Sequence, residues 1–482
     1  MRRYSVFAGI LLIALNFAAA QTSSSPGSKL VNSLRYKELN WQIPKVGVDV
    51  QRIVLENGMI VFLLPNHELP LVDANLLVRT GEIYEPKENM AIPGLTGKLM
   101  RTGGTKNIAP DSLDALLEFM AASIDIGIGE ESGWGSLSVL AKDIRLGFKV
   151  LADILMNPMF SEKKLRLAKE QIREDIRRRN DNPGRIIGRE FNHLIYGDHP
   201  KGSILEWADV KNIKRDDIIA FHRKYFCPNN VMMAIAGDFN PDTIIQILNE
   251  SFAGWSKQQI ELGPIPEVNF EYKPGVYIVN KDISQANILI GHLGIKRENP
   301  DRYAIALMNY ILGGGSFTSR LTTQVRSNEG LAYSVGSNFD ISSRDYGLFT
   351  AHCQTKNSTA HKAITLMLDE IRKISQTQVD TQEFAMARDA YINQFVFNFT
   401  SPGQIVNQLM SLEFNKMPPD YYEKYLDNIR AVKIEDIQRV AQIYLKPESL
   451  TIMVVGNPAD FDAPLDDFGT IKEIPLAPPV IR

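Results

Sequence analysis

The sequence predicts a mixed α+β fold made of two homologous units. Hydrophobic residues make up 44% and charged residues 23% of the 482 residues, which is typical of soluble globular proteins. One set of residues recurs at a constant offset along the chain. Short apolar runs typical of strands alternate with amphipathic, helix-like segments in each half. Together these observations favour a duplicated domain that buries a sheet under helices.

The overall composition limits the possible partners. At about 150 residues per domain, the length allows about three domains. Lys and Arg total 53 against 56 Asp and Glu, which gives a formal net charge of −3, and there is no long basic run. Because nucleic acid is bound mainly through clustered basic side chains, we do not expect it as a partner.

The N-terminus has the pattern of a cleaved secretory signal peptide. Arg2 and Arg3 precede an apolar run over residues 6–15, and three alanines follow at residues 18–20. The run is shorter than the roughly 20 residues that span a bilayer, and no later stretch reaches that length. We therefore expect residues 1–20 to be removed and the mature protein to be exported to the periplasm, without a membrane span.

Composition also marks the boundaries between the expected parts. Residues 21–46 contain a Ser-Ser-Ser-Pro-Gly stretch and predict an irregular N-terminal segment. Residues 263–275 contain five prolines and glycines that interrupt helices and strands alike, which predicts a linker. The predicted organisation is a signal peptide, an irregular segment, a first domain, a linker and a second domain, over residues 1–20, 21–46, 47–262, 263–275 and 276–482.

In the first domain, strands are expected at Ile60–Leu64 and Ala74–Val78, followed by a helix and further strands. A long helix over residues 161–180 carries an apolar stripe at spacings of three or four and is expected to end before Pro183. Its equivalent in the second domain is expected to end before Pro402.

The internal repeat has an offset of 219 residues. Five pairs share it: Pro183 and Pro402, Asp217 and Asp436, Tyr225 and Tyr444, Pro228 and Pro447, Gly237 and Gly456. Each copy has an amphipathic helix that ends at the tyrosine, a proline turn and a buried strand. The two strands are expected at Val231–Ala236 and Leu450–Val455. We infer that one ancestral unit was duplicated.

Several motifs resemble those of the insulinase or pitrilysin-type peptidases, the family that includes the mitochondrial processing peptidase. They are Leu55-Glu56-Asn57-Gly58, Leu77 to Pro86, Gly103-Gly104-Thr105, Tyr196 to Pro200, Leu312 to Phe317, and Arg326 with Gly330 to Tyr333. The resemblance implies two α/β-roll domains that form a clamshell around a peptide. In active members a helix carries His-x-x-Glu-His, and a further Glu follows about 77 residues later; these residues hold a catalytic zinc ion.

The zinc motif is degenerate in this chain. The alignment with the family places Gly94 at the first His, Gly97 at the catalytic Glu and Lys98 at the second His. Glycine has no donor atom, and a protonated ammonium cannot ligate zinc. Asp175, beside Glu174, occupies the region of the third ligand, and one carboxylate cannot hold the metal alone. We therefore expect no metal in this chain.

The histidines do not compensate for this loss. None of the seven, which are His67, His193, His199, His222, His292, His352 and His361, has another histidine four residues away. Cys227 and Cys353 are the only cysteines, and we expect both to be buried free thiols.

Lys98 has two possible roles at the metal position. In the first, its ammonium group forms an ion pair with Asp175 or Glu174 that replaces the metal. Alternatively, the side chain extends to water while its methylene groups cover apolar surface.

The second half carries an Arg and Tyr seven residues apart, Arg326 and Tyr333. In two-subunit members of the family, such a pair on the noncatalytic chain completes the partner's active site, with the guanidinium holding the substrate backbone and the phenol stabilising a developing oxyanion. Gly330 is expected to end a helix and to bring Tyr333 onto the next strand. The alternative is structural, with Arg326 paired to Glu329 and Tyr333 packed.

The family pattern also suggests a strand that binds the substrate by strand addition. It comprises Ser123, Ile124, Asp125, Ile126 and Gly127. Gly127 and Gly129 would permit close approach of another backbone, although strand glycines also mark bulges.

The leading hypothesis is a metal-free, noncatalytic subunit of a periplasmic insulinase-type peptidase. It is expected to be inactive alone, to bind extended peptides, and to form a heterodimer with a homologous subunit that carries the zinc. The alternative is a non-enzymatic scaffold similar to the core subunits of respiratory complexes, in which Arg326 and Tyr333 are structural.

Overall fold

The computed structural model describes residues 42–342 and 344–481. From Pro44 onward these residues form one compact unit. The predicted signal peptide and almost all of the predicted segment 21–46 lie outside the described residues. No helix within the described ranges has the length and apolarity that crossing a membrane requires.

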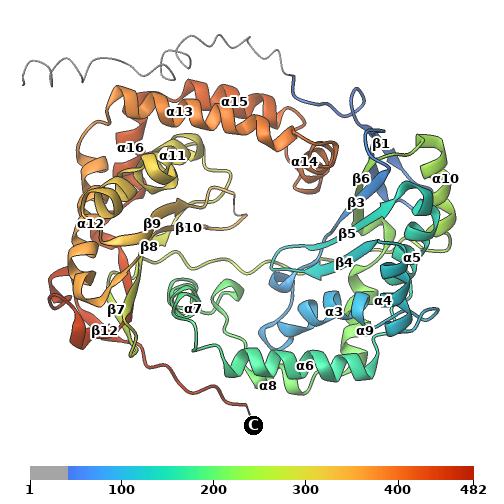
Figure 1. The fold of residues 1–482 in the computed structure, drawn as a ribbon, viewed down its shortest axis with the longest axis horizontal. Helices are drawn as coiled ribbons and strands as arrows, with labels where there is room; N and C mark the ends of the chain where they lie inside the picture. The colour runs from blue at the N-terminus through green and yellow to red at the C-terminus, as the bar shows by residue number, and fades with distance from the viewer. Residues whose placement is uncertain (1–41, 343, 482) are drawn as a thin grey trace, which may run out of the picture. The chain divides into compact units, whose positions relative to one another are not determined.

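The first half of the unit contains a six-stranded sheet with the order β1-β2-β6-β3-β5-β4 (Figure 1). Its strands are β1 (Gln51–Val54), β2 (Ile60–Pro65), β3 (Leu71–Val78), β4 (Ser123–Ile128), β5 (Gly133–Leu140) and β6 (Val231–Gly237). The β2–β6 pair is parallel, and every other pair is antiparallel. Strand β4 therefore lies at one edge of the sheet.

The second half repeats this arrangement with the order β12-β7-β11-β8-β10-β9. Its strands are β7 (Gly275–Asn280), β8 (Gln285–Leu293), β9 (Ala332–Phe339), β10 (Leu348–Lys356), β11 (Thr451–Gly456) and β12 (Ile471–Glu473). The β7–β11 pair is parallel, like β2–β6, and β9 takes the edge position of β4. The predicted α+β fold with two homologous units is confirmed.

Fourteen α-helices within the described ranges cover these sheets. Those of the first half are α3 (Ala91–Thr102), α4 (Pro110–Phe119), α5 (Ile144–Met156), α6 (Glu162–Arg177), α7 (Pro183–Tyr196), α8 (Trp207–Lys211), α9 (Arg215–Tyr225) and α10 (Pro241–Ser251). Those of the second half are α11 (Arg302–Asn309), α12 (Ala360–Gln376), α13 (Thr381–Phe395), α14 (Pro402–Phe414), α15 (Tyr421–Ala431) and α16 (Ile434–Tyr444). Residues 256–274, between the sheets, contain no regular element.

The two repeated prolines begin helices instead of marking the end of the preceding ones. Helix α6 ends at Arg177, and Pro183 is the first residue of α7, where the Asn182 side chain accepts a hydrogen bond from a backbone N–H. Pro402 begins α14 in the same way after the cap residue Ser401. Proline suits this position because its fixed φ matches a helix and the first turn needs no N–H donor.

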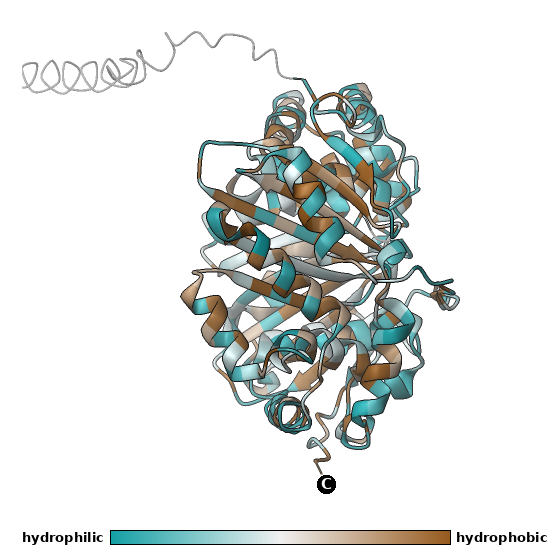
Figure 2. Ribbon diagram, turned by 90° about the vertical axis from the view of Figure 1, so that its right-hand side faces the viewer, coloured by the Kyte–Doolittle hydropathy of each residue, from teal (hydrophilic) through white to brown (hydrophobic). Residues whose placement is uncertain are grey.

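The central strands are buried on both faces. In β6, Val231, Met233 and Ile235 belong to the core of the first half. Their neighbours Met232 and Ala234 face the opposite side, where they pack against α14 from the second half. In Figure 2 the hydrophobic residues accordingly concentrate in the strands and on the helix faces beside them.

The second sheet receives a helix from the first half in return. Phe191 and Ile195 of α7 pack with Val279 of β7 and with Met453 and Val455 of β11. Each half thus contributes one helix to one face of the other sheet. Since Phe191, Val279, Met453 and Val455 are fully buried, the exchange ties the two halves into one core.

The two cysteines are free and buried, as predicted. Burial raises the pKa of the Cys353 thiol to about 12, and burial also raises the pKa of Cys227. Both thiols are therefore protonated and unreactive near neutral pH.

Candidate functional site

Helix α3 carries all three degenerate zinc-motif positions. Gly94 and Lys98 lie one turn apart on its exposed face, whereas Gly97 is buried. The buried face of the helix packs on β4 and α9. Two of the aligned motif positions therefore face solvent, and the catalytic position lies inside a packing interface.

Gly97 lies directly against the backbone of the edge strand β4. A Cβ atom at position 97 would stand 2.8 Å from the Ile128 nitrogen and 3.0 Å from the Gly127 Cα. Real Cβ atoms do not approach backbone atoms this closely, so a side chain here requires the helix or the strand to move. The position that bears the catalytic Glu in active relatives is closed in this chain.

Gly127 is packed from both sides. Gly97 lies against one face, and the indole ring of Trp134, its cross-strand neighbour on β5, covers the other. The close backbone approach predicted at Gly127 does occur, and the approaching backbone is that of α3. Gly127 therefore serves the packing of the helix on the strand.

Of the two roles considered for Lys98, the ion pair with Asp175 or Glu174 is not the one observed. The Lys98 ammonium donates a hydrogen bond of 2.6 Å to the side-chain oxygen of Gln171, one helical turn before Asp175. Glu174 instead pairs with Arg177 at 2.8 Å and with Arg178. Lys98 is exposed, so its alkyl chain lies on the protein surface, and a neutral amide accepts its hydrogen bond.

These residues do not fit a zinc ion. Two motif positions are glycines, and the third is an ammonium already bound to Gln171. Among residues 42–342 and 344–481, no three His, Cys, Asp or Glu side chains are grouped to hold a metal ion. The buried histidines bond to the backbone: His222 to the Leu155 carbonyl and His292 to that of Leu445, both at 2.8 Å.

Arg326 and Tyr333 are brought into contact. The Arg326 guanidinium carbon lies 4.9 Å from the centre of the Tyr333 ring and 4.7 Å from the centre of the Phe317 ring. Glu329, the acid proposed as a structural partner, instead pairs with Lys362 at 2.6 Å. No ion pair or side-chain hydrogen bond joins the Arg326 guanidinium to another described residue. Cation–π contacts with two aromatic rings therefore hold it.

Tyr333 is held out into solvent by a β-bulge. Ala332 pairs with Thr355 and Ser334 with Gln354, so Tyr333 is an extra residue on β9 without a partner on β10. Its side chain is 85% exposed, which excludes the packed role considered from the sequence.

Gly330 ends the helical segment before this strand, as predicted. It takes a left-handed φ of 64°, and its N–H donates to the Arg326 carbonyl.

Phe317 is a member of this site that the sequence reasoning did not single out. It is 67% exposed and stacks on Arg326. The preceding Ser316 adopts a left-handed φ of 51°, a strained conformation for a residue other than glycine. The only sequence feature that marks Phe317 is its place at the end of the glycine-rich motif Leu312 to Phe317, which does not reveal a contact with Arg326. We call Phe317, Arg326 and Tyr333 the aromatic–arginine cluster.

Strand β4 lies at a sheet edge, where strand addition is possible in principle. Ser123 and Asp125 are exposed, and Ile124 and Ile126 are buried in the core. Arg101 already donates a 3.2 Å hydrogen bond to the Ile124 carbonyl. One of the edge acceptors is therefore occupied.

Comparison with known proteins places these features in a family. Residues 61–208 match the family model described as insulinase (peptidase family M16), and residues 212–391 match the model described as peptidase M16 inactive domain. Together the two matches cover more than half of the chain. The chain belongs to the insulinase family. The resemblance inferred from the sequence motifs is thus confirmed.

Relatives in the insulinase family are described both as zinc proteases and as non-peptidase homologs. An uncharacterized zinc protease of Rickettsia felis is 28% identical over 324 residues, which cover 66% of this chain and 75% of the relative. A protein of Helicobacter pylori described as non-peptidase homolog YmxG is 23% identical over 399 residues, which cover 81% of this chain and 90% of the relative.

Solved structures of insulinase-type proteins share the fold. The peptidase M16 inactive domain from Pseudomonas fluorescens matches with a TM-score of 0.75 and 23% identity, covering 85% of this chain and 98% of its own. The periplasmic protease PqqL from Escherichia coli matches with a TM-score of 0.72 and 14% identity, covering 91% of this chain and 51% of its own. At these identities the likeness supports the fold alone.

Proposed function

We propose that this protein is a metal-free, noncatalytic subunit of an exported insulinase-type peptidase, and that it supplies Arg326 and Tyr333 to the active site of a zinc-bearing partner. The observation that carries the proposal is the exposed aromatic–arginine cluster. A cation without a carboxylate partner, held between two exposed rings, has no evident role in the stability of the isolated chain.

The stacking leaves the hydrogen-bonding edge of the guanidinium available. Its five N–H donors lie in one plane, so rings on its faces do not block a carbonyl or carboxylate that approaches along the edge. The Tyr333 phenol, 85% exposed on its bulge, has a hydroxyl that can donate to an oxygen on which negative charge develops. A zinc-bearing partner without its own arginine and tyrosine at the active site would obtain both groups from this chain.

The substrate proposed is a peptide in extended form, bound by strand addition. Strand β4 supports this proposal as an edge strand, and its exposed residues Ser123 and Asp125 alternate with buried isoleucines. Export to the periplasm is proposed from the N-terminal sequence pattern. The zinc is proposed to reside in the partner subunit.

The second candidate is a non-enzymatic scaffold, and the packing at Gly97 favours it. The helix position that carries the catalytic Glu in active relatives is used here to pack β4, so this part of the first half is specialised for structure. In that function the aromatic–arginine cluster would contact another protein without taking part in catalysis.

Coexpression with a homologous subunit that carries an intact His-x-x-Glu-His separates the two candidates. We expect the purified pair to cleave unfolded peptides, and Arg326→Ala to lower kcat/KM about 10²-fold, a typical loss for one transition-state donor. Tyr333→Phe should lower kcat more than it changes KM. The matched control is Arg388→Ala, because Arg388 also stacks on a ring, that of Phe384 at 5.5 Å.

Gel filtration would show whether each variant still forms the pair. Cleavage that is indifferent to both Arg326→Ala and Tyr333→Phe, in pairs that still assemble, would establish the scaffold function instead.

A further inference from the structure

A small cationic cavity lies among loop residues of both halves, the C-terminal end of α14 and the segment between the sheets. Its volume is about 180 Å³, and four of the side chains that line it are cations while one is a carboxylate. The charged residues are Arg79, Arg297, Arg344, Lys416 and Glu131. We call this space the cationic cavity. The excess of positive charge in a small volume favours the binding of an anion.

The single carboxylate does not neutralise this cavity. Glu131 lies 3.7 Å from Arg344 and is also shared with Lys201 at 3.3 Å. Arg344 further donates to the Tyr84 hydroxyl and to the Asn415 side-chain oxygen, at 3.2 and 3.3 Å, which are neutral acceptors. The geometry therefore fixes the Arg344 guanidinium in place without cancelling its charge.

Arg79 is a partly buried cation without a carboxylate partner among the described residues. Its guanidinium stacks on the Phe414 ring at 5.1 Å. The nearby Glu413 is engaged by Arg52 through two hydrogen bonds of 2.7 Å. No described residue forms an ion pair or side-chain hydrogen bond with the Arg79 guanidinium. Burial lowers the pKa of Arg79; Glu413 opposes this effect and the neighbouring Arg344 adds to it.

Arg297 and Lys416 complete the ring of charge. Arg297 pairs at 2.8 Å with Glu298, whose side chain is largely exposed. Lys416 is exposed and adopts a left-handed φ of 55° just after α14. A left-handed lysine where glycine is usual holds a cation at the mouth of the cavity at a conformational cost.

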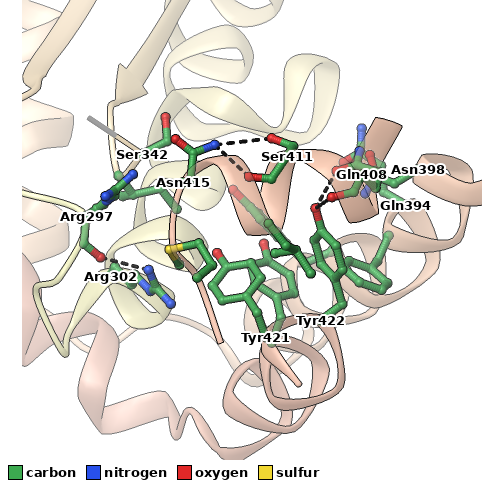
Figure 3. A pocket seen from close by; sticks show the side chains of 16 residues that line it. Arg297, Arg302, Ser342, Gln394, Asn398, Gln408, Ser411, Asn415, Tyr421 and Tyr422 are labelled. Carbon is green, nitrogen blue, oxygen red and sulfur yellow. Dashed lines mark hydrogen bonds between the residues drawn. The ribbon is translucent and has the colours of Figure 1, made fainter. Parts of the chain in front are cut away.

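A second, larger cavity borders the first. Its volume is about 530 Å³, in the range of small-molecule sites, and Arg297 and Asn415 line both cavities. Half of its other lining residues carry phenol or side-chain amide groups, among them Tyr391, Tyr421, Tyr422, Tyr425, Gln394 and Gln408. A second arginine, Arg302, also lines it and lies over the Tyr421 ring at 5.1 Å. Figure 3 shows Arg297 and Asn415 at one end, with the tyrosines and glutamines extending away from them. We call this space the tyrosine cavity.

We propose that the two cavities together bind a small organic anion with an aromatic body. The carboxylate or phosphate group is held by Arg79 and Arg344 in the cationic cavity, and the ring lies among the tyrosines beyond Arg297. Arginine binds planar carboxylates and phosphates through paired N–H donors. Aromatic side chains stack on a ring with little loss of conformational freedom. This site is independent of the peptidase function proposed above.

Isothermal titration calorimetry of the complete mature chain with four probes tests the proposal. Phenyl phosphate and phenylacetate carry both parts of the expected ligand, whereas inorganic phosphate and acetate carry only the anion. We expect each aromatic probe to bind at least tenfold more tightly than its counterpart without a ring. The stronger of the two aromatic probes identifies phosphate or carboxylate as the preferred anion.

Two variants separate the roles of the two cavities. Arg79→Gln should weaken the binding of all four probes at least tenfold, whereas Tyr421→Leu should weaken only the aromatic probes. The matched control is Arg145→Gln, which removes the same charge from an exposed arginine paired to Glu250 in the first half. Arg344→Gln provides a second test of the anion contact if Arg79→Gln lowers the thermal unfolding midpoint.

Three results would overturn the proposal. They are the absence of binding of all four probes, equal weakening by Arg79→Gln and Arg145→Gln, and equal affinity for probes with and without a ring. Because the titration uses this chain alone, its outcome does not depend on whether a zinc-bearing partner is activated.

Discussion

Replacement of Gly97 by alanine tests whether the catalytic position is closed by packing. The change adds one methyl group to a buried helix position that lies against β4. Its Cβ would meet the Ile128 nitrogen at 2.8 Å and the Gly127 Cα at 3.0 Å, and both are backbone atoms. Because backbone atoms cannot rotate away, the helix or the edge strand must shift.

The expected magnitude follows from two opposing terms. Alanine is favoured over glycine inside a helix by about 1 kcal/mol. Overpacking of a tightly packed interior costs about 1–3 kcal/mol, and contact with an immobile backbone belongs in the upper part of that range. We therefore expect Gly97→Ala to lower the free energy of unfolding by about 1–2 kcal/mol.

Gly94→Ala is the matched control in the same helix. Position 94 is exposed, and the nearest atom to an added Cβ is a Glu82 carboxylate oxygen at 4.0 Å, an ordinary contact. Only the helix term remains, so this variant should gain about 0.5–1 kcal/mol.

Thermal unfolding followed by circular dichroism measures both variants. The unit begins at Pro44 and is roughly twice the length for which about 2–4 °C per kcal/mol holds, so 1 kcal/mol corresponds to about 1 °C. The midpoint should therefore fall by about 1–2 °C for Gly97→Ala and rise by about 0.5–1 °C for Gly94→Ala. Equal midpoints for the two variants would show that the contact between α3 and β4 is not tight.

Three further predictions follow from the described contacts. The triple variant G94H/G97E/K98H should have a lower thermal unfolding midpoint than the natural chain, since its new Glu at position 97 has no room against β4. Burial lowers the pKa of His222 to about 4, so the folded protein resists protonation while the unfolded chain binds a proton near pH 6.5. Stability should therefore fall as the pH drops from about 6.5 to about 4, by up to about 3 kcal/mol from this residue, and His222→Gln should flatten the pH dependence of the unfolding midpoint. Phe191→Ala should cost about 3–5 kcal/mol and speed amide hydrogen exchange in β7 and β11 more than in β6, because this α7 side chain packs on the second sheet.

The duplication and the fold class could be predicted because they depend on local patterns. The strands predicted at Val231–Ala236 and Leu450–Val455 are β6 and β11 within one residue at each end. Both are continuous apolar runs because both faces of each strand are covered. An apolar run before a turn is visible in the sequence, but the helix that covers its second face is not.

The exchange of α7 and α14 between the halves could not be predicted for this reason. A helix shows which of its faces is apolar, and nothing in that pattern names the sheet on which it packs. The sequence pattern around the repeated prolines Pro183 and Pro402 was interpreted as marking the ends of the preceding helices. In the structure these prolines mark the starts of the two exchanged helices.

The contacts in the candidate site differ from those expected from the sequence by one residue or one helical turn. Lys98 reaches Gln171 instead of Asp175, which is four residues further along α6. Tyr333 is exposed because of a single unpaired residue in β9, and a bulge leaves no distinct signal in one sequence. The seven-residue spacing of Arg326 and Tyr333 was visible, but the stacking of Phe317 on Arg326 required the folded loop.

Gly313 provides the last test of this view, because it occupies in the second half the position that Gly97 occupies in the first. The two glycines are 216 residues apart, close to the repeat offset. A Cβ at Gly313 would clash with the Ser337 nitrogen and lie 2.8 Å from the Gly336 carbonyl carbon, both on the equivalent edge strand β9. If glycine at this place is a packing element of the duplicated unit, Gly313→Ala should also lower the free energy of unfolding, by at least the 1–2 kcal/mol expected for Gly97→Ala. Thermal unfolding of the two variants, measured under the same conditions, tests this prediction. A Gly313→Ala variant as stable as the natural chain would show that the tight glycine contact at position 97 is not a shared feature of the two halves.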